Sequence, residues 1–109
     1  MKYVVDIDGT ICRHPKGNRN EYRDAMPIYD RIAKINKLYD SGHTVIYLTA
    51  RGMGRYNDDT YLANKEFYQF TYDQLRSWGC KFHKLFLGKP SGDYYIDDKG
   101  IHSDDFFKT

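Results

Sequence analysis

The sequence predicts an α/β domain in which helices cover both faces of a parallel sheet. Short apolar, β-branched segments alternate along the chain with longer segments of helical periodicity. Glycines follow both helical segments as stop signals. The chain has 109 residues, of which 40% are hydrophobic and 29% charged. That size and composition suit one domain with one core, so we expect a single domain over residues 1–109.

The first half of the chain contains two predicted strands and one helix. Tyr3, Val4 and Val5 begin a buried strand that ends at Gly9. Residues 12–25 are polar and predict a long loop. Pro27 opens a helix whose apolar residues recur at helical spacing as far as Gly42. Residues 43–49 form the next buried strand.

The second half repeats the alternation. Residues 51–59 predict a loop, and a helix covers about 60–78 before Gly79. Asp58-Asp59 is the expected N-terminal cap of that helix. Residues 81–87 and 93–96 predict two further strands. Ile101, Phe106 and Phe107 of the polar tail are expected to pack back on the domain.

Polar and charged residues follow every predicted strand. The strands end in Asp6-Ile7-Asp8-Gly9-Thr10, Thr49-Ala50-Arg51-Gly52, Gly88-Lys89-Pro90 and Asp97-Asp98. The carboxyl ends of parallel strands meet at one edge of a sheet, so these groups should gather there. Clustered carboxylates need a counter-charge, and Mg²⁺ favours a few carboxylates together with a substrate phosphate. The sequence therefore predicts a magnesium site.

The residue types at this edge are suited to phosphoryl transfer. Asp6 is a candidate nucleophile that would form an aspartyl-phosphate. Asp8 can act as general acid and then as general base. Gly9 permits a sharp turn close to the phosphoryl oxygens. Thr49 and Lys89 offer a hydroxyl and a positive charge to those oxygens.

These four motifs, in this order, resemble those of the haloacid dehalogenase (HAD) superfamily. The resemblance implies a Rossmannoid three-layer sandwich, Asp6 as nucleophile and Asp8 as acid/base. It implies Mg²⁺ held by Asp6, the Asp8 carbonyl and an acid of the last pair, with Asp97 preferred over Asp98. The adjoining residues are the expected substrate contacts, and they are Gly9, Thr10, Ala50 and Arg51.

A closer resemblance extends over nearly the whole chain. Residues 22–27, 49–53, 87–90 and 95–98 are similar to those of a group of very small HAD phosphatases encoded among capsule and surface-polysaccharide genes. This similarity implies a phosphorylated sugar or a related metabolite as substrate. The chain departs from that group at Ser91, where Trp is common, and in a shorter segment before Asp97. The resemblance therefore implies the class of substrate but not its identity.

The spacing of the motifs leaves no room for a cap domain. Residues 11–48 separate Thr10 from Thr49, and residues 50–88 separate Thr49 from Lys89. The core helices and strands use most of both segments, so a bulky substrate or a neighbouring subunit must cover the site. Five arginines lie in or beside the loops at 12–25 and 51–59 and could pair with substrate anions: Arg13, Arg19, Arg23, Arg51 and Arg55.

Composition limits the alternatives. The formal charge of +2, without a basic stripe, argues against nucleic acid. The two cysteines and four histidines match no metal spacing, and no apolar segment reaches membrane-spanning length. We expect a soluble cytoplasmic protein. The exposed site and the many tyrosines favour self-association into a homo-oligomer.

Three rival functions stay open at this point. The first is a signalling receiver domain, but its phosphoacceptor would lie at mid-chain. The second is a polynucleotide 3′-end phosphatase, which salt-sensitive oligonucleotide binding would favour. The third is a non-catalytic phosphoacceptor or metal-binding module, which would bind Mg²⁺ without turnover.

Overall fold

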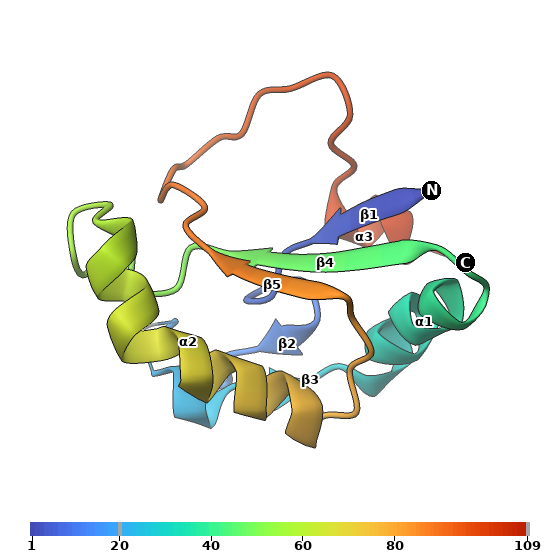
Figure 1. Ribbon diagram of the computed structural model, residues 1–109, viewed down its shortest axis with the longest axis horizontal. Helices are drawn as coiled ribbons and strands as arrows, with labels where there is room; N and C mark the ends of the chain where they lie inside the picture. The colour runs from blue at the N-terminus through green and yellow to red at the C-terminus, as the bar shows by residue number, and fades with distance from the viewer. Residues whose placement is uncertain (20, 109) are drawn as a thin grey trace.

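A three-stranded parallel sheet forms the centre of the molecule (Figure 1). The structure is a computed structural model that describes residues 1–19 and 21–108. The strands are β1 (Lys2–Val5), β4 (Thr44–Thr49) and β5 (Lys84–Leu87), in the order β1-β4-β5. In their register Val4 lies opposite Ile46, and Leu48 lies opposite Phe86. The predicted α/β class and parallel sheet are confirmed.

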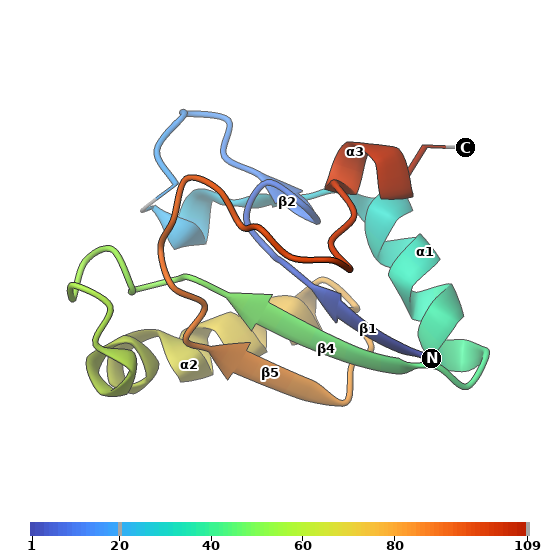
Figure 2. The same ribbon diagram turned by 90° about the horizontal axis from the view of Figure 1, so that it is seen from above.

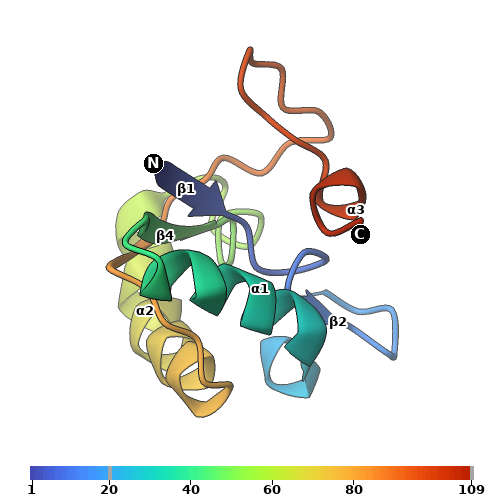
Figure 3. The same ribbon diagram turned by 90° about the vertical axis from the view of Figure 1, so that its right-hand side faces the viewer.

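Both long helices cover the same face of this sheet. α1 (Tyr29–Asp40) packs on β4, and α2 (Thr60–Ser77) packs on β5. Figures 1 and 3 show both helices below the strands. The chain moves in one direction across the sheet, from β1 to β4 to β5, and right-handed crossovers then place both helices on one side. The prediction of helices on both faces is therefore wrong.

The core lies between the sheet and these two helices. It contains alternate residues of the strands, because successive side chains of a strand point to opposite faces. Its most buried members, each 0% exposed, are Ile7, Ile11, Cys12, Val45, Tyr47 and Leu75. Ile32 and Ile35 of α1 add to it, at 2% and 1% exposed. The helical periodicity read from the sequence identified these contacts.

The segment predicted as one loop over 12–25 contains regular structure. β2 (Cys12–Arg13) pairs antiparallel with β3 (Met26–Pro27), and the 3₁₀ helix η1 (Tyr22–Asp24) lies between them. Position 20 of that predicted loop lies outside the described residues. Because Pro27 is used in this pairing, α1 begins at Tyr29, and the N–H of Ile28 donates to the Ile11 carbonyl at 2.8 Å.

α2 begins and ends as predicted. The Asp59 carboxylate accepts a hydrogen bond from the N–H of Leu62 at 3.1 Å, which confirms the N-terminal cap. Gly79 follows the helix with a φ of 79°. None of the helices in the described part of the chain is both long and apolar enough to cross a membrane.

Residues 88–102, which we call the arm, contain no helix or strand within the described chain. The predicted strand at 93–96 is wrong. The Tyr95 hydroxyl donates to the Pro90 carbonyl at 2.6 Å and accepts from the N–H of Gly92 at 3.0 Å, so local bonds fold this segment on itself. Tyr94 and Ile96 are 87% and 96% exposed.

The arm ends in the short helix α3 (Ser103–Phe106), which is anchored on α1. Arg31 pairs with Asp104 at 3.0 Å, and Lys34 donates to the Phe106 carbonyl at 2.6 Å. Phe106 and Phe107 pack against the core, as predicted. Ile101 is 66% exposed, so the prediction that it packs back is wrong.

Candidate functional site

Asp6 lies directly after β1, at the carboxyl edge of the sheet. Its Oδ2 accepts a hydrogen bond from the Thr10 hydroxyl at 3.3 Å, and its Oδ1 lies 3.7 Å from Lys89 Nζ. Burial raises the pKa of Asp6, while the charge of Lys89 opposes that rise. The side chain is still 32% exposed, so a ligand can reach the carboxylate.

A tight turn connects Asp6 to Cys12. The N–H groups of Thr10 and Ile11 both donate to the Ile7 carbonyl, at 3.0 and 2.9 Å. Gly9 has a φ of 81°, a conformation that favours glycine. The Arg19 guanidinium lies directly over Gly9, where a Cβ would collide with it. The turn thus places Asp6, Thr10 and one arginine at the same surface.

Asp8 is held from two sides. Arg51 donates to both of its carboxylate oxygens, from Nε at 2.9 Å and from Nη2 at 3.0 Å, and His14 Nε2 lies 2.8 Å from Oδ1. Burial alone would raise the pKa of Asp8. The hydrogen bonds and charges of Arg51 and His14 outweigh burial and lower that pKa below its usual value. Asp8 is therefore an anion fixed in one orientation.

Arg51 lies beneath the site rather than on it. Its side chain is 0% exposed. Besides Asp8, it donates to Gln74 at 2.7 Å and to Thr71 at 3.3 Å, and its guanidinium lies 4.7 Å from the centre of the Tyr22 ring. We predicted Arg51 as a substrate contact, but its side chain is enclosed and makes four hydrogen bonds within the protein. Its role in this structure is to position Asp8.

Thr49 joins the ends of β4 and β5. Its carbonyl accepts from the N–H groups of Gly88 and Lys89, both at 3.2 Å, which brings Lys89 to Asp6. Its hydroxyl accepts from the N–H of Arg51 at 3.2 Å, and the residue is 1% exposed. Ala50 is half-buried and accepts from the N–H of Met53. Thr49 and Ala50 therefore shape this edge from within.

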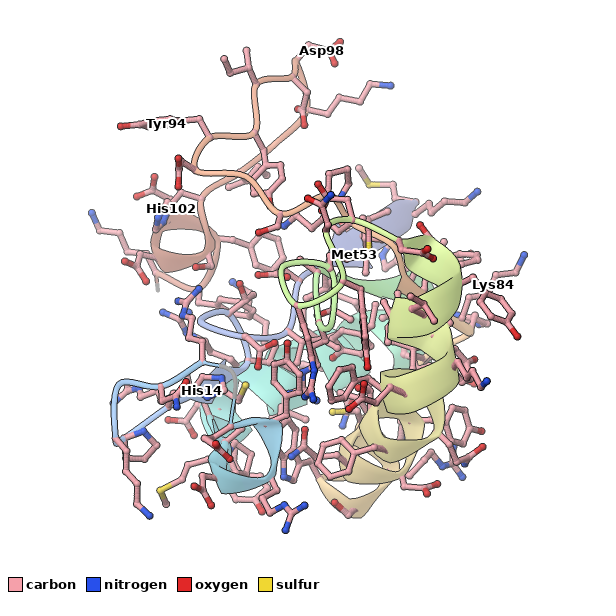
Figure 4. The ribbon with its side chains drawn as sticks, turned by 90° about the vertical axis from the view of Figure 1, so that its left-hand side faces the viewer. His14, Met53, Lys84, Tyr94, Asp98 and His102 are labelled. Carbon is pink, nitrogen blue, oxygen red and sulfur yellow. The ribbon has the colours of Figure 1, made fainter. Side chains whose placement is uncertain are left out.

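Asp97 and Asp98 are not brought to Asp6. Both lie on the arm, and Figure 4 shows Asp98 and Tyr94 projecting from it, far from His14. Asp97 Oδ1 accepts from the N–H groups of Lys99 and Gly100, which lowers the pKa of Asp97 in a local turn. The predicted completion of the metal site by these two acids is not met in this structure.

The capacity of the site for a metal can be judged from its donors. Asp8, Cys12 and His14 offer one ligand atom each within 4.8 Å of one another. The Arg51 guanidinium already neutralises Asp8, and burial raises the pKa of the Cys12 thiol to about 12, so this group is unsuited to a cation. Asp6 has an accessible carboxylate and fits Mg²⁺, which binds through one or two carboxylates plus substrate phosphate.

His14 lies beside Asp8, although the four histidines matched no metal spacing in the sequence and none was predicted to belong to the site. Its side chain is 5% exposed, and its Nδ1 has no hydrogen-bond partner among the described residues. Cys12 and His14 lie two positions apart along one extended segment, and successive side chains of such a segment point to opposite sides. Both therefore point inward toward Asp8, while Arg13 between them is exposed. The alternation of Cys12, Arg13 and His14 directly after the first motif is the sequence signal that could have predicted the inward position of His14.

A crystal structure of a structural-genomics target protein from Vibrio cholerae is similar to this chain. The two are 25% identical with a TM-score of 0.87, over 99% of this chain and 88% of the other. The two proteins share their fold. No protein-family model and no curated protein matches the chain.

Proposed function

We propose that this protein is a Mg²⁺-dependent phosphomonoester hydrolase of the capless HAD type that uses Asp6 as its nucleophile. One observation carries the proposal. The accessible Asp6 carboxylate lies between the Thr10 hydroxyl and the Lys89 ammonium, at the edge where β1, β4 and β5 all end. Three of the four motifs that resemble the HAD superfamily meet at this edge, while the fourth, Asp97-Asp98, does not.

The reaction follows from these positions. Thr10 holds Oδ2 of Asp6, so Oδ1 is oriented to attack phosphorus. The P–O(ester) bond breaks, the alcohol leaves, and Asp6 carries the phosphoryl group. Water then attacks phosphorus, the P–O(Asp6) bond breaks, and inorganic phosphate is released. Lys89, 3.7 Å from Asp6, and Arg19, over Gly9, would stabilise the charge that develops on the phosphoryl oxygens, which is the main task of such a site.

The proton steps fall to Asp8 and His14 together. The leaving alcohol needs a proton, but Asp8 is held as an anion by Arg51. His14, 2.8 Å away, can carry a proton that the pair shares. The pair gives this proton to the leaving oxygen and takes one back from the attacking water. Asp8 therefore keeps its proposed acid/base role, with His14 as its proton partner.

Magnesium would supply a positive charge that offsets the phosphate and draws it toward Asp6. Asp6 is the carboxylate that would hold the ion, and the Asp8 carbonyl is the other proposed ligand. For the chain itself, the requirement is that Asp6 stays ionised, and the adjacent Lys89 favours that state.

The proposed substrate is a sugar phosphate or a related metabolite of polysaccharide biosynthesis, as the closer resemblance implies. A polynucleotide 3′-end phosphatase is the second candidate. It is favoured by three exposed arginines of the segment 12–25, one of them over Gly9, that make no ion pair within the described chain, namely Arg13, Arg19 and Arg23. Such residues suit a polyanion, and their contribution would weaken as salt rises.

Phosphate release from a panel of esters tests the proposal. The panel holds sugar phosphates, nucleotides and 3′-phosphorylated oligonucleotides, each with Mg²⁺ and with chelator. We expect turnover of one class, lost with chelator. We expect Asp8→Asn to slow it by about a hundredfold or more. His14→Ala should also slow turnover, while His14→Gln, which keeps a donor, should slow it less. If the folded protein binds Mg²⁺ but releases phosphate from none of these esters, a phosphotransfer or binding module is favoured instead.

A further inference from the structure

The sheet has a second face, opposite α1 and α2, which we call the open face. Its apolar centre is formed by alternate residues of all three strands: Val4, Ile46, Leu48 and Phe86. Their register places Val4 next to Ile46 and Leu48 next to Phe86. Val4 and Phe86 are 58% and 50% exposed. None of the described helices crosses this face, which Figure 2 views from above.

Such a face is unusual for a parallel sheet. Parallel sheets are almost always covered on both faces, and their strands are apolar on both sides for that reason. In this chain the crossovers cover one face only. The apolar residues of the open face are therefore left without the covering layer that a parallel sheet ordinarily has.

The arm carries the complementary half of such an interaction. It rises on the open side of the sheet, as Figures 1 and 3 both show. Tyr94, Ile96 and Ile101 are 87%, 96% and 66% exposed on it. Three aspartates on the arm, Asp93, Asp97 and Asp98, outnumber its two lysines, Lys89 and Lys99. Asp93 and Asp98 are both exposed. At the rim of the open face, by contrast, Lys2 and Lys84 are exposed.

The arm is held away from its own sheet. Near its start, the N–H of Ser91 donates to Asp58 at 3.2 Å, and the Tyr95 hydroxyl bonds to Pro90 and Gly92. At its far end, α3 is anchored on α1 through the ion pair between Arg31 and Asp104. An arm that folded onto its own open face would lose some of these bonds. The arm of another molecule loses none.

We propose that a second copy of this chain covers the open face, in a two-fold symmetric dimer in which each arm lies on the partner's sheet. An isologous interface needs both halves on one surface, and this chain exposes an apolar basic face and an apolar acidic arm together. Three strands about 4.8 Å apart, with four paired residues each, present only on the order of 200–300 Å². A stable interface needs about 800 Å² per partner, so the arms must contribute most of it.

Sedimentation velocity over a concentration series tests this directly. The wild-type chain should sediment as a dimer that weakens as salt rises, because acid–base contacts are screened. Phe86→Asp and Ile96→Asp should each yield monomers with unchanged circular dichroism. Tyr61→Asp is the matched control, since Tyr61 is 71% exposed on α2, the helix that covers the opposite face of the sheet, and this variant should stay dimeric. The proposal is overturned if the wild-type chain is monomeric at its highest soluble concentration. It is also overturned if the Phe86→Asp variant sediments as a dimer.

A charge-reversal experiment separates a second copy from other occupants. One chain carries Lys2→Glu and Lys84→Glu, and the other carries Asp93→Lys and Asp98→Lys. Each alone should be monomeric, because like charges then face each other in its homodimer. Their mixture should form a heterodimer, in which both arm–face contacts are again of opposite charge. Failure of the mixture to associate, while the wild type dimerises, would place the interface elsewhere.

Discussion

Arg51 and Asp8 form a buried ion pair, and we expect its loss to cost about 4 kcal/mol of the free energy of unfolding. Two charge-assisted hydrogen bonds join the residues, at 2.9 and 3.0 Å. Hydrogen bonds to charged groups contribute about 1.5–3 kcal/mol each, and removal of one partner of a buried pair costs about 3–5 kcal/mol. The side chains are 0% and 14% exposed, so solvent screens them little.

Urea unfolding followed by the fluorescence of Trp78, the single tryptophan, measures this cost. Arg51→Met, which leaves the Asp8 carboxylate without its counter-charge, should lower the free energy of unfolding by about 4 kcal/mol. In a double-mutant cycle with Asp8→Asn, the coupling energy should be about 2–3 kcal/mol. Arg55→Met is the control: Arg55 pairs with Glu66 at 3.3 Å, but its side chain is 63% exposed, and such pairs contribute about 0–1 kcal/mol.

The same pair has a defined pH dependence. The folded-state pKa of Asp8 is lowered from its ordinary value of 3.8. Its contribution to stability is therefore present above pH 3.8 and is lost as pH falls through the folded-state pKa. The stability difference between wild type and Asp8→Asn should accordingly narrow at the acid end. An Arg51→Met cost below about 1 kcal/mol, or a coupling energy near zero, would refute the assignment of Arg51 as the group that positions Asp8.

Three further predictions follow from single contacts. Lys89→Met should lower kcat by about 10²–10³-fold, because the positive charge that stabilises the phosphoryl oxygens is lost. It should also shift the acid limb of the pH–rate profile to higher pH, since the charge of Lys89 opposes the rise in the pKa of Asp6. Gly52→Ala should cost about 2–4 kcal/mol in chemical denaturation, because Gly52 has a φ of 80° and a Cβ would collide with side chains of α2; Gly42→Ala, at a φ of 93° with open space around it, should cost less. Asp59→Ala should cost about 1 kcal/mol in the same assay through the lost cap of α2.

Local signals in the sequence were sufficient to predict the three strands of the parallel sheet, β1, β4 and β5, and both long helices. Apolar periodicity, a capping aspartate and glycine stops act over a few residues, and the structure places Asp59 and Gly79 where these signals predicted. The meeting of Asp6 and Lys89 was also predictable, because parallel strands deliver their carboxyl ends to one edge.

The predictions that failed depend on non-local contacts or on competing local hydrogen bonds. Which face of the sheet the helices cover depends on the order of the strands, and that order is set by long-range strand pairing. Residues 93–96 include residue types that favour strands. They form none because the side chains of Tyr95 and Asp97 make hydrogen bonds to backbone groups within the arm. The roles of Arg51 and His14 depend on burial beside Asp8, and residue type alone does not reveal burial.

The most direct test of the central claim is Mg²⁺-dependent phosphate release by wild type and Asp6→Asn on the ester that the panel identifies. Asp93→Asn, on the exposed arm, is the matched control. We expect Asp6→Asn to lose turnover while circular dichroism and urea unfolding show an intact fold, and Asp93→Asn to keep turnover. Full activity in Asp6→Asn would contradict the account, because phosphoryl transfer would then not pass through this carboxylate.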